Sequence, residues 1–531
     1  MPLDETMRPP RFAVIGAGFA GLTAAIKLMH EGAEVTVFER SDGVGGVWRA
    51  NHYPGAACDV PSFLYSWSFA PKHDWSRRFA PQAEILEYIE RTVDELGVRD
   101  RIRTGHDLRA MTWSDETGDW TLDFADGRFA TADFVVAALG QMSVPAVPSI
   151  PGAERFEGTS FHTADWRHDV ELDHRDVVVI GAGASALQVV PAIADSVRTL
   201  SIVQRSPGYV LAKGDEEHDR PPTPLGSRIA RYAAYLSKEL KTPRLVRWPR
   251  LVARAEAAFR RDLRAEVANP ELLEKVEPDD RYGCKRILVS NDWYRTLQRP
   301  DVHLHDGVVA EIRSRSVLLR DGSEVPADVI IYGTGFHASS FLHGIDVSGV
   351  GGRMLETAWR RTPSAYLGMT VPGMPNLFLM YGPNTNPAWN SVLVMLECQV
   401  RYIVSAARRW RRRGAFSMEV NPEAAQRFAD QLRTRSARSV WVTGCQNWFT
   451  TADGTNTQNW PALVTEYWLR TRRVRWSDYT IRARAGLSRV AERLSRSTLG
   501  SLNGSVAERG RRQETGDRPP GLHDVAASRL P

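Results

Sequence analysis

The stretch FEGTSFHTADW, from Phe156 to Trp166, lies between two glycine-rich patterns, GAGFAG at 16–21 and GAGASA at 181–186. Each pattern follows a short apolar run typical of a strand and precedes a helical run, which is the arrangement of a dinucleotide-binding βαβ unit. A short aromatic connector with one histidine therefore joins two nucleotide sites. We predict an α/β protein with two Rossmann-like dinucleotide-binding domains.

The first pattern supplies Gly16, Gly18 and Gly21. The first glycine allows a tight turn, the second lets the backbone approach a pyrophosphate, and the third lets helix and strand pack closely. The next predicted strand, 34–38, ends at Glu39, whose carboxylate would accept hydrogen bonds from ribose hydroxyls. The alternative is a glycine-rich turn without a ligand.

The second pattern supplies three small residues: Gly181, Gly183 and Ala186. The offset that leads from Gly16 to Glu39 leads here to Gln204, followed by Arg205 and Ser206, with no carboxylate. A carboxylate would repel a 2′-phosphate and an arginine would bind it, so we predict NADPH at this site. The alternative is that Arg205 is only a surface residue. Two such sites indicate a flavoprotein that takes electrons from a nicotinamide nucleotide.

A loop rich in glycine and aromatic residues, GGVWRANHYPGAACD at 45–59, lies between the two patterns. We expect neither regular helix nor strand here. Such a loop brings backbone against a flat ring system and places Trp48, Tyr53 and Asp59 around it. The alternative for Asp59 is an aspartate that caps a turn.

Composition narrows the class of protein. The chain has 531 residues, 43% hydrophobic and 25% charged, with a net charge of +5, as expected for a soluble globular protein of two or three domains without a nucleic-acid partner. Its four cysteines form no CxxC pair, which argues against a metal site or a disulfide framework and for a reducing cytosol. A first strand near residue 12 leaves little room for a signal peptide, and no apolar run is long enough to span a membrane. We expect a cytoplasmic protein with no membrane partner.

Other segments indicate the domain organisation. Helices are expected at 82–96 and 393–409, buried strands at 134–139, 327–332 and 375–381, and a hairpin within 112–129 that turns at Asp126-Gly127. A basic helical run between 213 and 287 is expected to be an inserted subdomain whose charges face solvent; a lid over the substrate is the alternative. The division we predict is an FAD-binding domain of 8–148 and 341–484, an NADPH-binding domain of 149–212 and 288–340, a helical subdomain of 213–287 and a disordered tail of 497–531.

Two motifs resemble those of the Baeyer–Villiger monooxygenases, among the class B flavoprotein monooxygenases. The fingerprint FxGxxxHxxxW is met by Phe156, Gly158, His162 and Trp166. The pattern GGxWxxxxYPGxxxD is met by Gly45, Gly46, Trp48, Tyr53, Pro54, Gly55 and Asp59. The resemblance extends to about residue 482. One position departs from it, because the family usually has Pro or Asp where this chain has Arg167.

The resemblance implies FAD at the first glycine-rich site, with Gly46 and Trp48 beside it, and NADPH at the second. It also implies that Arg286, in the run GCKR, is the active-site arginine and that Asp59 is the carboxylate that positions it.

Further roles follow from the same resemblance. Lys285 would join Arg205 and Ser206 on the 2′-phosphate, and Trp448 would contact the nicotinamide nucleotide. His162 would be a conformational element of the connector and not a general base.

The implied activity is the conversion of a ketone to an ester or lactone with NADPH and O2 through a flavin peroxide, beside which Arg286 would stabilise negative charge. The nearest alternative is an N- or S-oxygenating flavin monooxygenase on the same fold, which needs no such arginine and which Arg167 keeps open. A disulfide reductase would need a cysteine partner for Cys58, and a non-catalytic flavin-binding scaffold would need none of the site residues. The sequence does not identify the ketone, the regioselectivity, the pathway or the oligomeric state.

Overall fold

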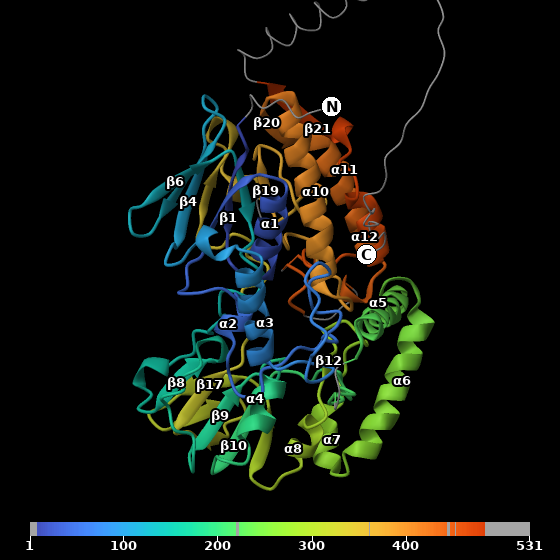
Figure 1. The fold of residues 1–531 in the computed structure, drawn as a ribbon. Coiled ribbons are helices and arrows are strands. Elements are labelled where there is room, and N and C mark those ends of the chain that lie inside the picture. Colours follow the sequence, from blue (N-terminus) through green and yellow to red (C-terminus); the bar gives the residue numbers. More distant parts are fainter. Residues whose placement is uncertain (1–7, 219–221, 360–361, 443–446, 452, 484–531) are drawn as a thin grey trace, which may run out of the picture.

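The computed structural model describes residues 8–218, 222–359, 362–442, 447–451 and 453–483. Figure 1 shows two α/β units, one above the other, with two long helices, α5 and α6, along one side. Each unit is built around a parallel sheet of five strands. The predicted fold class, an α/β protein with two Rossmann-like units and a helical insertion, is confirmed.

The sheet of the first unit has the strand order β19-β7-β1-β2-β3, and all its pairings are parallel. Its strands are β1 (Arg11–Ile15), β2 (Glu34–Phe38), β3 (Ile102–Arg103), β7 (Phe134–Ala137) and β19 (Leu377–Leu379). β1 and β7 are continuous apolar runs because both faces of the sheet are covered; Val14 and Val136 are fully buried. β19 comes from far along the chain. In sequence, the strands of this sheet therefore lie both before and after those of the other five-stranded sheet.

Helices cover one face of this sheet and strands the other. On the helical face α1 (Phe19–His30) packs against α10 (Val392–Arg413), and α3 (Gln82–Glu95) follows the aromatic loop. The other face is covered by a sheet of order β18-β4-β5-β6. Its strands are β4 (Leu108–Trp113), β5 (Trp120–Phe124), β6 (Phe129–Ala132) and β18 (Asp346–Ser348).

This second layer corrects the predicted hairpin. The turn at Asp126-Gly127 is present between β5 and β6, but the stretch 112–124 is not one strand. It turns back on itself between Trp113 and Trp120, where Gly118 has a φ of 70°. The single predicted hairpin is therefore a three-stranded meander.

The sheet of the second unit has the order β13-β10-β9-β17-β8 and is also parallel. Its strands are β8 (Thr159–His162), β9 (Asp176–Ile180), β10 (Thr199–Gln204), β13 (Val302–Asp306) and β17 (Val329–Tyr332). The helices α4 (Ala186–Ile193) and α8 (Trp293–Leu297) accompany it, as does a small antiparallel sheet of β14 (Val309–Ile312), β15 (Ser316–Leu319) and β16 (Glu324–Pro326). The predicted connector is thus partly an edge strand: β8 pairs along β17, with His162 opposite Tyr332.

The predicted helical insertion is confirmed as α5 (Pro224–Arg247), α6 (Pro249–Glu266) and α7 (Pro270–Val276). The chain enters and leaves it through the short strands β11 (Val210–Leu211) and β12 (Leu288–Val289), which pair with each other. Arg231 on α5 donates to the carbonyl oxygens of Phe63 and Ser66 at 3.0 and 2.8 Å. These bonds attach the insertion to the first unit.

The remaining elements complete the first unit. They are α2 (Val47–Ala50), α9 (Leu355–Trp359), β20 (Ala415–Val420), α11 (Pro422–Ser436), α12 (Val464–Thr471) and β21 (Tyr479–Ala483). α2 is a single helical turn inside the aromatic loop, where no regular structure was expected. β20 and β21 form an antiparallel pair that the sequence did not predict.

The predicted division into domains agrees with the strand membership of the two sheets and stays a prediction; its tail, 497–531, lies outside the described residues. In the described part of the chain no helix is long and apolar enough to cross a membrane. Cys284 is disulfide-bonded, a bond for which the cysteine spacing gave no sign.

Candidate nucleotide and oxygenation site

The first glycine turn has the steric features that its sequence predicts. Gly16 has a φ of +103°, and a Cβ atom there would lie 2.6 Å from the carbonyl oxygen of Ala138. A Cβ on Gly21 would lie 1.8 Å from the carbonyl oxygen of Gly16, so helix α1 can begin this close to β1 only at a glycine. The turn brings bare backbone and a helix N-terminus to the carboxyl end of β1, which suits a pyrophosphate.

The aromatic loop closes onto this turn. A Cβ on Gly46, which has a φ of +55°, would lie 3.0 Å from Cα of Gly18. Two glycines from separate motifs therefore face each other through their backbones. Trp48 follows directly, and its indole N–H donates to the Tyr65 hydroxyl at 3.1 Å. This hydrogen bond fixes the Trp48 side chain close to the two facing glycines.

Glu39 is buried at the carboxyl end of β2. Its Oε2 accepts from the amide of Ala17 at 2.7 Å, and its Oε1 accepts from the amide and hydroxyl of Ser41 at 2.9 and 2.7 Å. These bonds hold the carboxylate beside the glycine turn and leave it capacity for a further donor. Together with the bare backbone, the geometry fits the ribose and pyrophosphate of FAD.

Asp59, at the end of the aromatic loop, forms an ion pair with Arg286, which lies between α7 of the helical insertion and β12. Burial raises the pKa of Asp59, but the charges of Arg286 and Lys238 and the hydrogen bond from Arg286 outweigh it, so the pKa lies below its ordinary value. The Asp59 carboxylate in turn raises the pKa of Arg286. About a third of each side chain, 33% for Arg286 and 30% for Asp59, stays accessible to solvent. The guanidinium of Arg286 is thus held by Asp59, and part of it stays accessible to solvent.

Two residues that the sequence did not single out support this pair. Lys238, on α5, lies close enough for Asp59 to oppose the lowering of its pKa by burial. Gln188, on α4, accepts from the Tyr53 hydroxyl at 3.0 Å and donates to the carbonyl oxygen of Ala57 at 2.9 Å. Neither residue lies in a recognisable motif. Their contacts with the loop of Asp59 depend on how α4 and α5 pack against it, which the sequence does not show.

The second glycine turn repeats part of the first. Gly181 has a φ of +116°, and a Cβ there would lie 2.4 Å from the carbonyl oxygen of Gly333. Ala186 is buried at the start of α4, whereas Gly183 faces open space. The predicted set Gly181, Gly183 and Ala186 thus lies at the carboxyl end of β9, where a nucleotide pyrophosphate would approach.

The end of β10 carries the predicted 2′-phosphate residues. Gln204 is buried and donates to Asp306 at 2.5 Å, so its side chain links the ends of β10 and β13. Arg205 and Ser206 are exposed beyond it, and Lys285 donates to the Ser206 hydroxyl at 2.8 Å. Lys285 also pairs with Asp280, which the sequence did not predict. The structure brings Lys285 and Ser206 together and leaves Arg205 turned to solvent.

His162 ends β8 and is buried. Its Nδ1 accepts from the amide of Ala164 at 3.0 Å and caps the short turn that follows, and burial lowers its pKa. A Cβ on Gly158 would lie 2.2 Å from the carbonyl oxygen of Asp328, and Trp166 packs edge-on against Phe161 at 5.1 Å. These contacts show a structural role for three residues of the fingerprint: Gly158, His162 and Trp166.

Phe156, the first fingerprint residue, and Arg167, the residue that follows the fingerprint, have other surroundings. Phe156 packs with the small antiparallel sheet of the second unit. Arg167 pairs with Asp169 at 2.5 Å, with half of its side chain exposed. The position that departs from the family pattern is therefore a surface ion pair.

Trp448 belongs to a small apolar cluster. It packs on Phe449, with ring centroids 4.5 Å apart, in a cluster that also includes Val252 of α6 and Tyr282. Tyr282 lies shortly before Lys285 in sequence. Trp448 and Tyr282 thus pack against the same cluster, and the contact of Trp448 with the nicotinamide stays a prediction.

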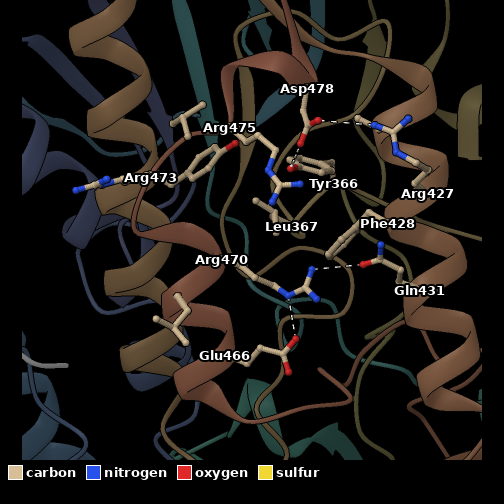
Figure 2. Close-up of a pocket in the computed structure, with 14 residues that line it drawn as sticks. Tyr366, Leu367, Arg427, Phe428, Gln431, Glu466, Arg470, Arg473, Arg475 and Asp478 are labelled. Atoms are coloured by element: carbon tan, nitrogen blue, oxygen red, sulfur yellow. Dashed lines mark hydrogen bonds and ion pairs between the residues drawn. The ribbon is translucent and has the colours of Figure 1, made fainter.

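A cavity of about 650 Å³ lies elsewhere, between α11, α12 and the segment before β21. Figure 2 shows that its polar groups largely satisfy one another: Arg470 bonds to Glu466 and Gln431, and Asp478 accepts from Tyr366. Its lining includes none of the predicted site residues. We do not assign it to the reaction.

Two glycine turns at the carboxyl ends of two parallel sheets, together with the ion pair of Arg286 and Asp59, define a protein class that uses two dinucleotides. A family model described as flavin-binding monooxygenase-like matches residues 10–347. The chain belongs to the flavin-binding monooxygenase-like family.

The relatives narrow this family. A protein of Streptomyces coelicolor named Baeyer-Villiger monooxygenase is 37% identical over 94% of this chain and 97% of its own length. One of the same name from Pseudomonas aeruginosa is 35% identical over 90% of this chain and 92% of its own. A solved steroid monooxygenase bound to NADP superposes with a TM-score of 0.81 at 28% identity, covering 90% of this chain and all of that structure. Cyclohexanone monooxygenase from Rhodococcus sp. Phi1 bound to NADP⁺ gives 0.80 at 25%, with coverage of 90% and 100%.

Proposed function

We propose that this protein is an FAD- and NADPH-dependent Baeyer–Villiger monooxygenase that inserts one oxygen atom of O2 beside a ketone carbonyl to give an ester or lactone. The observation that carries the proposal is the ion pair of Arg286, at the end of the helical insertion, with Asp59 of the first unit. The names of the relatives in Streptomyces and Pseudomonas agree with it. The protein acts on a small molecule, and we place it in the cytoplasm.

The residues that would hold the two nucleotides follow from the geometry. Gly16, Gly18, Gly21 and Glu39 would bind the pyrophosphate and ribose of FAD, with Gly46 and Trp48 beside them. The second turn and the group of Ser206, Lys285 and Arg205 would bind NADPH through its phosphates. FAD, when bound, would supply the redox chemistry by which the two electrons of NADPH reduce O2, so that one oxygen atom enters the ketone and the other leaves as water.

Arg286 has the properties needed to stabilise an oxyanion. Asp59 raises its pKa, so the guanidinium stays charged at every pH at which the protein works. Asp59 also fixes its orientation, which removes the reorganisation that a mobile cation would need as negative charge develops. The accessible third of the side chain is the part left to meet the substrate carbonyl.

The alternatives are less well supported. N- or S-oxygenation needs no oxyanion-stabilising arginine, although a relative named phenazine N-monooxygenase from Lysobacter antibioticus is 30% identical over 73% of this chain. Arg167, the sequence reason for that alternative, is a surface ion pair with Asp169. A disulfide reductase is disfavoured because Cys58 has a free thiol whose pKa burial raises to about 12.

The decisive experiment compares Arg286→Ala with wild-type enzyme on a panel of ketones and thioethers. We expect wild type to form products one oxygen heavier from ketones. Arg286→Ala should still oxidise NADPH but should form ester at least about 100-fold more slowly, because a single lost oxyanion contact has an effect of that order. Mass spectrometry of the products and the loss of NADPH absorbance measure the two rates.

The matched control is Arg281→Ala, which removes an exposed arginine from the same segment. It should behave as wild type. Normal ester formation by Arg286→Ala would remove the assigned role. Oxygen transfer by wild type only to sulfur or nitrogen would contradict the Baeyer–Villiger activity itself.

A further inference from the structure

Helix α5 exposes several large apolar side chains. Four large apolar residues, Leu225, Ile229, Leu236 and Leu240, are between 57% and 73% exposed, and Tyr232 is 37% exposed. Their spacing of three and four places them along one side of the helix. We call this set the α5 stripe. Over 225–240 it extends about 22 Å along the helix.

Other side chains of α5 are buried, and several of them are polar, in the company of Tyr235. Ser227, Glu239 and Thr242 are each less than 9% exposed. Glu239 accepts from the amides of Val464 and Thr465 at 3.2 and 2.8 Å, at the start of α12. The helix is therefore held in this orientation by specific bonds, and the stripe cannot turn inward without breaking them.

The charges around the stripe are of one sign. Glu239 is the only carboxylate in the sequence of α5, and it faces inward. The exposed charged residues beside the stripe, Arg228 and Lys241, are both cations. Beyond the helix, Trp248 is 51% exposed and is followed by the exposed Arg250. The outer surface of α5 thus combines large apolar side chains, an exposed tryptophan and positive charge.

We propose that the α5 stripe docks this protein on the surface of an anionic lipid membrane. Leucine, isoleucine and tryptophan side chains enter the boundary between headgroups and acyl chains, while arginine and lysine bind anionic headgroups. A second copy of the chain fits less well, because a two-fold contact centred on the stripe would bring Arg228 of each copy towards Lys241 of the other. This surface departs from the expectation, drawn from the sequence, that no membrane takes part.

Figure 1 shows where α5 lies in the molecule. α5 and α6 form one side of the molecule, beside α12 and away from the two sheets. Docking there leaves both glycine turns unobstructed. The binding is peripheral, and it needs no segment that crosses the bilayer.

The test is co-sedimentation of the full chain with vesicles of phosphatidylglycerol and phosphatidylcholine, or of phosphatidylcholine alone, without ketone. We expect binding to the anionic vesicles that weakens with added salt, and much weaker binding to the neutral ones. The variant I229Q/L236Q should reduce the partition coefficient at least ten-fold. R228Q/K241Q should reduce binding and flatten its salt dependence, because fewer counterions take part.

The matched control is F129Q/V147Q, which removes two apolar side chains that are 73% and 53% exposed in the first unit. It should bind as wild type, and circular dichroism should show that all variants are folded. Absence of binding to anionic vesicles, or a loss in the control F129Q/V147Q equal to that in I229Q/L236Q, would overturn the proposal. Sedimentation velocity covers the remaining case: a dimer that only I229Q/L236Q dissociates would show that a second copy occupies the stripe.

Discussion

Asp59 lies beside two cations, Arg286 and Lys238, and its negative charge offsets the repulsion between them. Removing one member of a buried pair typically costs about 3–5 kcal/mol. Here about a third of each partner's side chain is accessible, so solvent screens part of the effect. At the scale of one residue, the loop that carries Asp59 depends on that residue for stability as well as for chemistry.

We therefore expect Asp59→Asn to lower the free energy of unfolding at pH 7 by about 1–3 kcal/mol. The pKa of Asp59 is lowered in the folded protein, so its contribution is full above the unfolded value of about 3.9 and is lost as the pH falls through the folded value. The gap between wild type and variant should stay constant from pH 8 to 5 and narrow only below about pH 4. Urea unfolding at several pH values measures it.

The control is Asp169→Asn, which removes the carboxylate of the surface pair with Arg167. This variant should unfold at the same urea concentration as wild type. A gap for Asp59→Asn that widened as the pH fell would show that Asp59 is protonated in the folded protein and that Arg286 is not held by its charge.

At the scale of the element, local rules predicted most of the fold. β2 was predicted with its observed bounds, and α3 within one residue at its end, because local periodicity marks where such elements begin and end. β8 was missed since four residues of the connector give no clear alternation, and its strand character comes from pairing with β17. The same limit applies to the site, where glycine turns were predicted but Lys238 and Gln188 were not. Periodicity places a residue on one face of a helix but does not say what packs there.

The residues that follow β10 allow a test of the predicted 2′-phosphate site. Arg205 is exposed just beyond the strand, while Lys285 and Ser206 already contact each other. If Arg205 binds the 2′-phosphate, Arg205→Ala should raise the KM for NADPH about 10- to 100-fold, because a charged hydrogen bond contributes about 1.5–3 kcal/mol. The KM for NADH should not change. Initial rates with each nucleotide measure both constants.

Arg175→Ala, which removes an exposed arginine before β9, is the control and should leave both constants unchanged. Equal losses for NADPH and NADH would mean that Arg205 contributes only general positive charge. An unchanged KM for NADPH would leave the 2′-phosphate to Lys285 and Ser206 alone.

At the scale of the whole molecule, the two nucleotide units meet through α4. Gln188 bonds to Tyr53 and Ala57, and a Cβ on Gly55 would lie 2.4 Å from the carbonyl oxygen of Gln188. The loop that ends in Asp59 is thus seated on the helix that begins at the second glycine turn. The side chain of Gln188 thus links the loop that carries Asp59 to α4.

Gln188→Ala should therefore separate the two half-reactions. The glycine turns are intact in this variant, so NADPH should still be oxidised at a rate near that of wild type. Ester formed per NADPH consumed should fall several-fold, because a displaced Asp59 no longer orients Arg286. Product mass and NADPH absorbance followed on the same sample give this coupling ratio.

Two further variants separate positioning from stability. Gln188→Glu keeps an acceptor for Tyr53 but loses the donor to Ala57, so its coupling ratio should fall between those of wild type and Gln188→Ala. Gln426→Ala, on exposed α11, should leave the ratio unchanged. A general loss of stability would lower NADPH oxidation and ester formation together, and such a parallel loss in Gln188→Ala would contradict a positioning role. A selective loss of coupling would instead show that the contact between the units determines whether reducing equivalents reach the ketone.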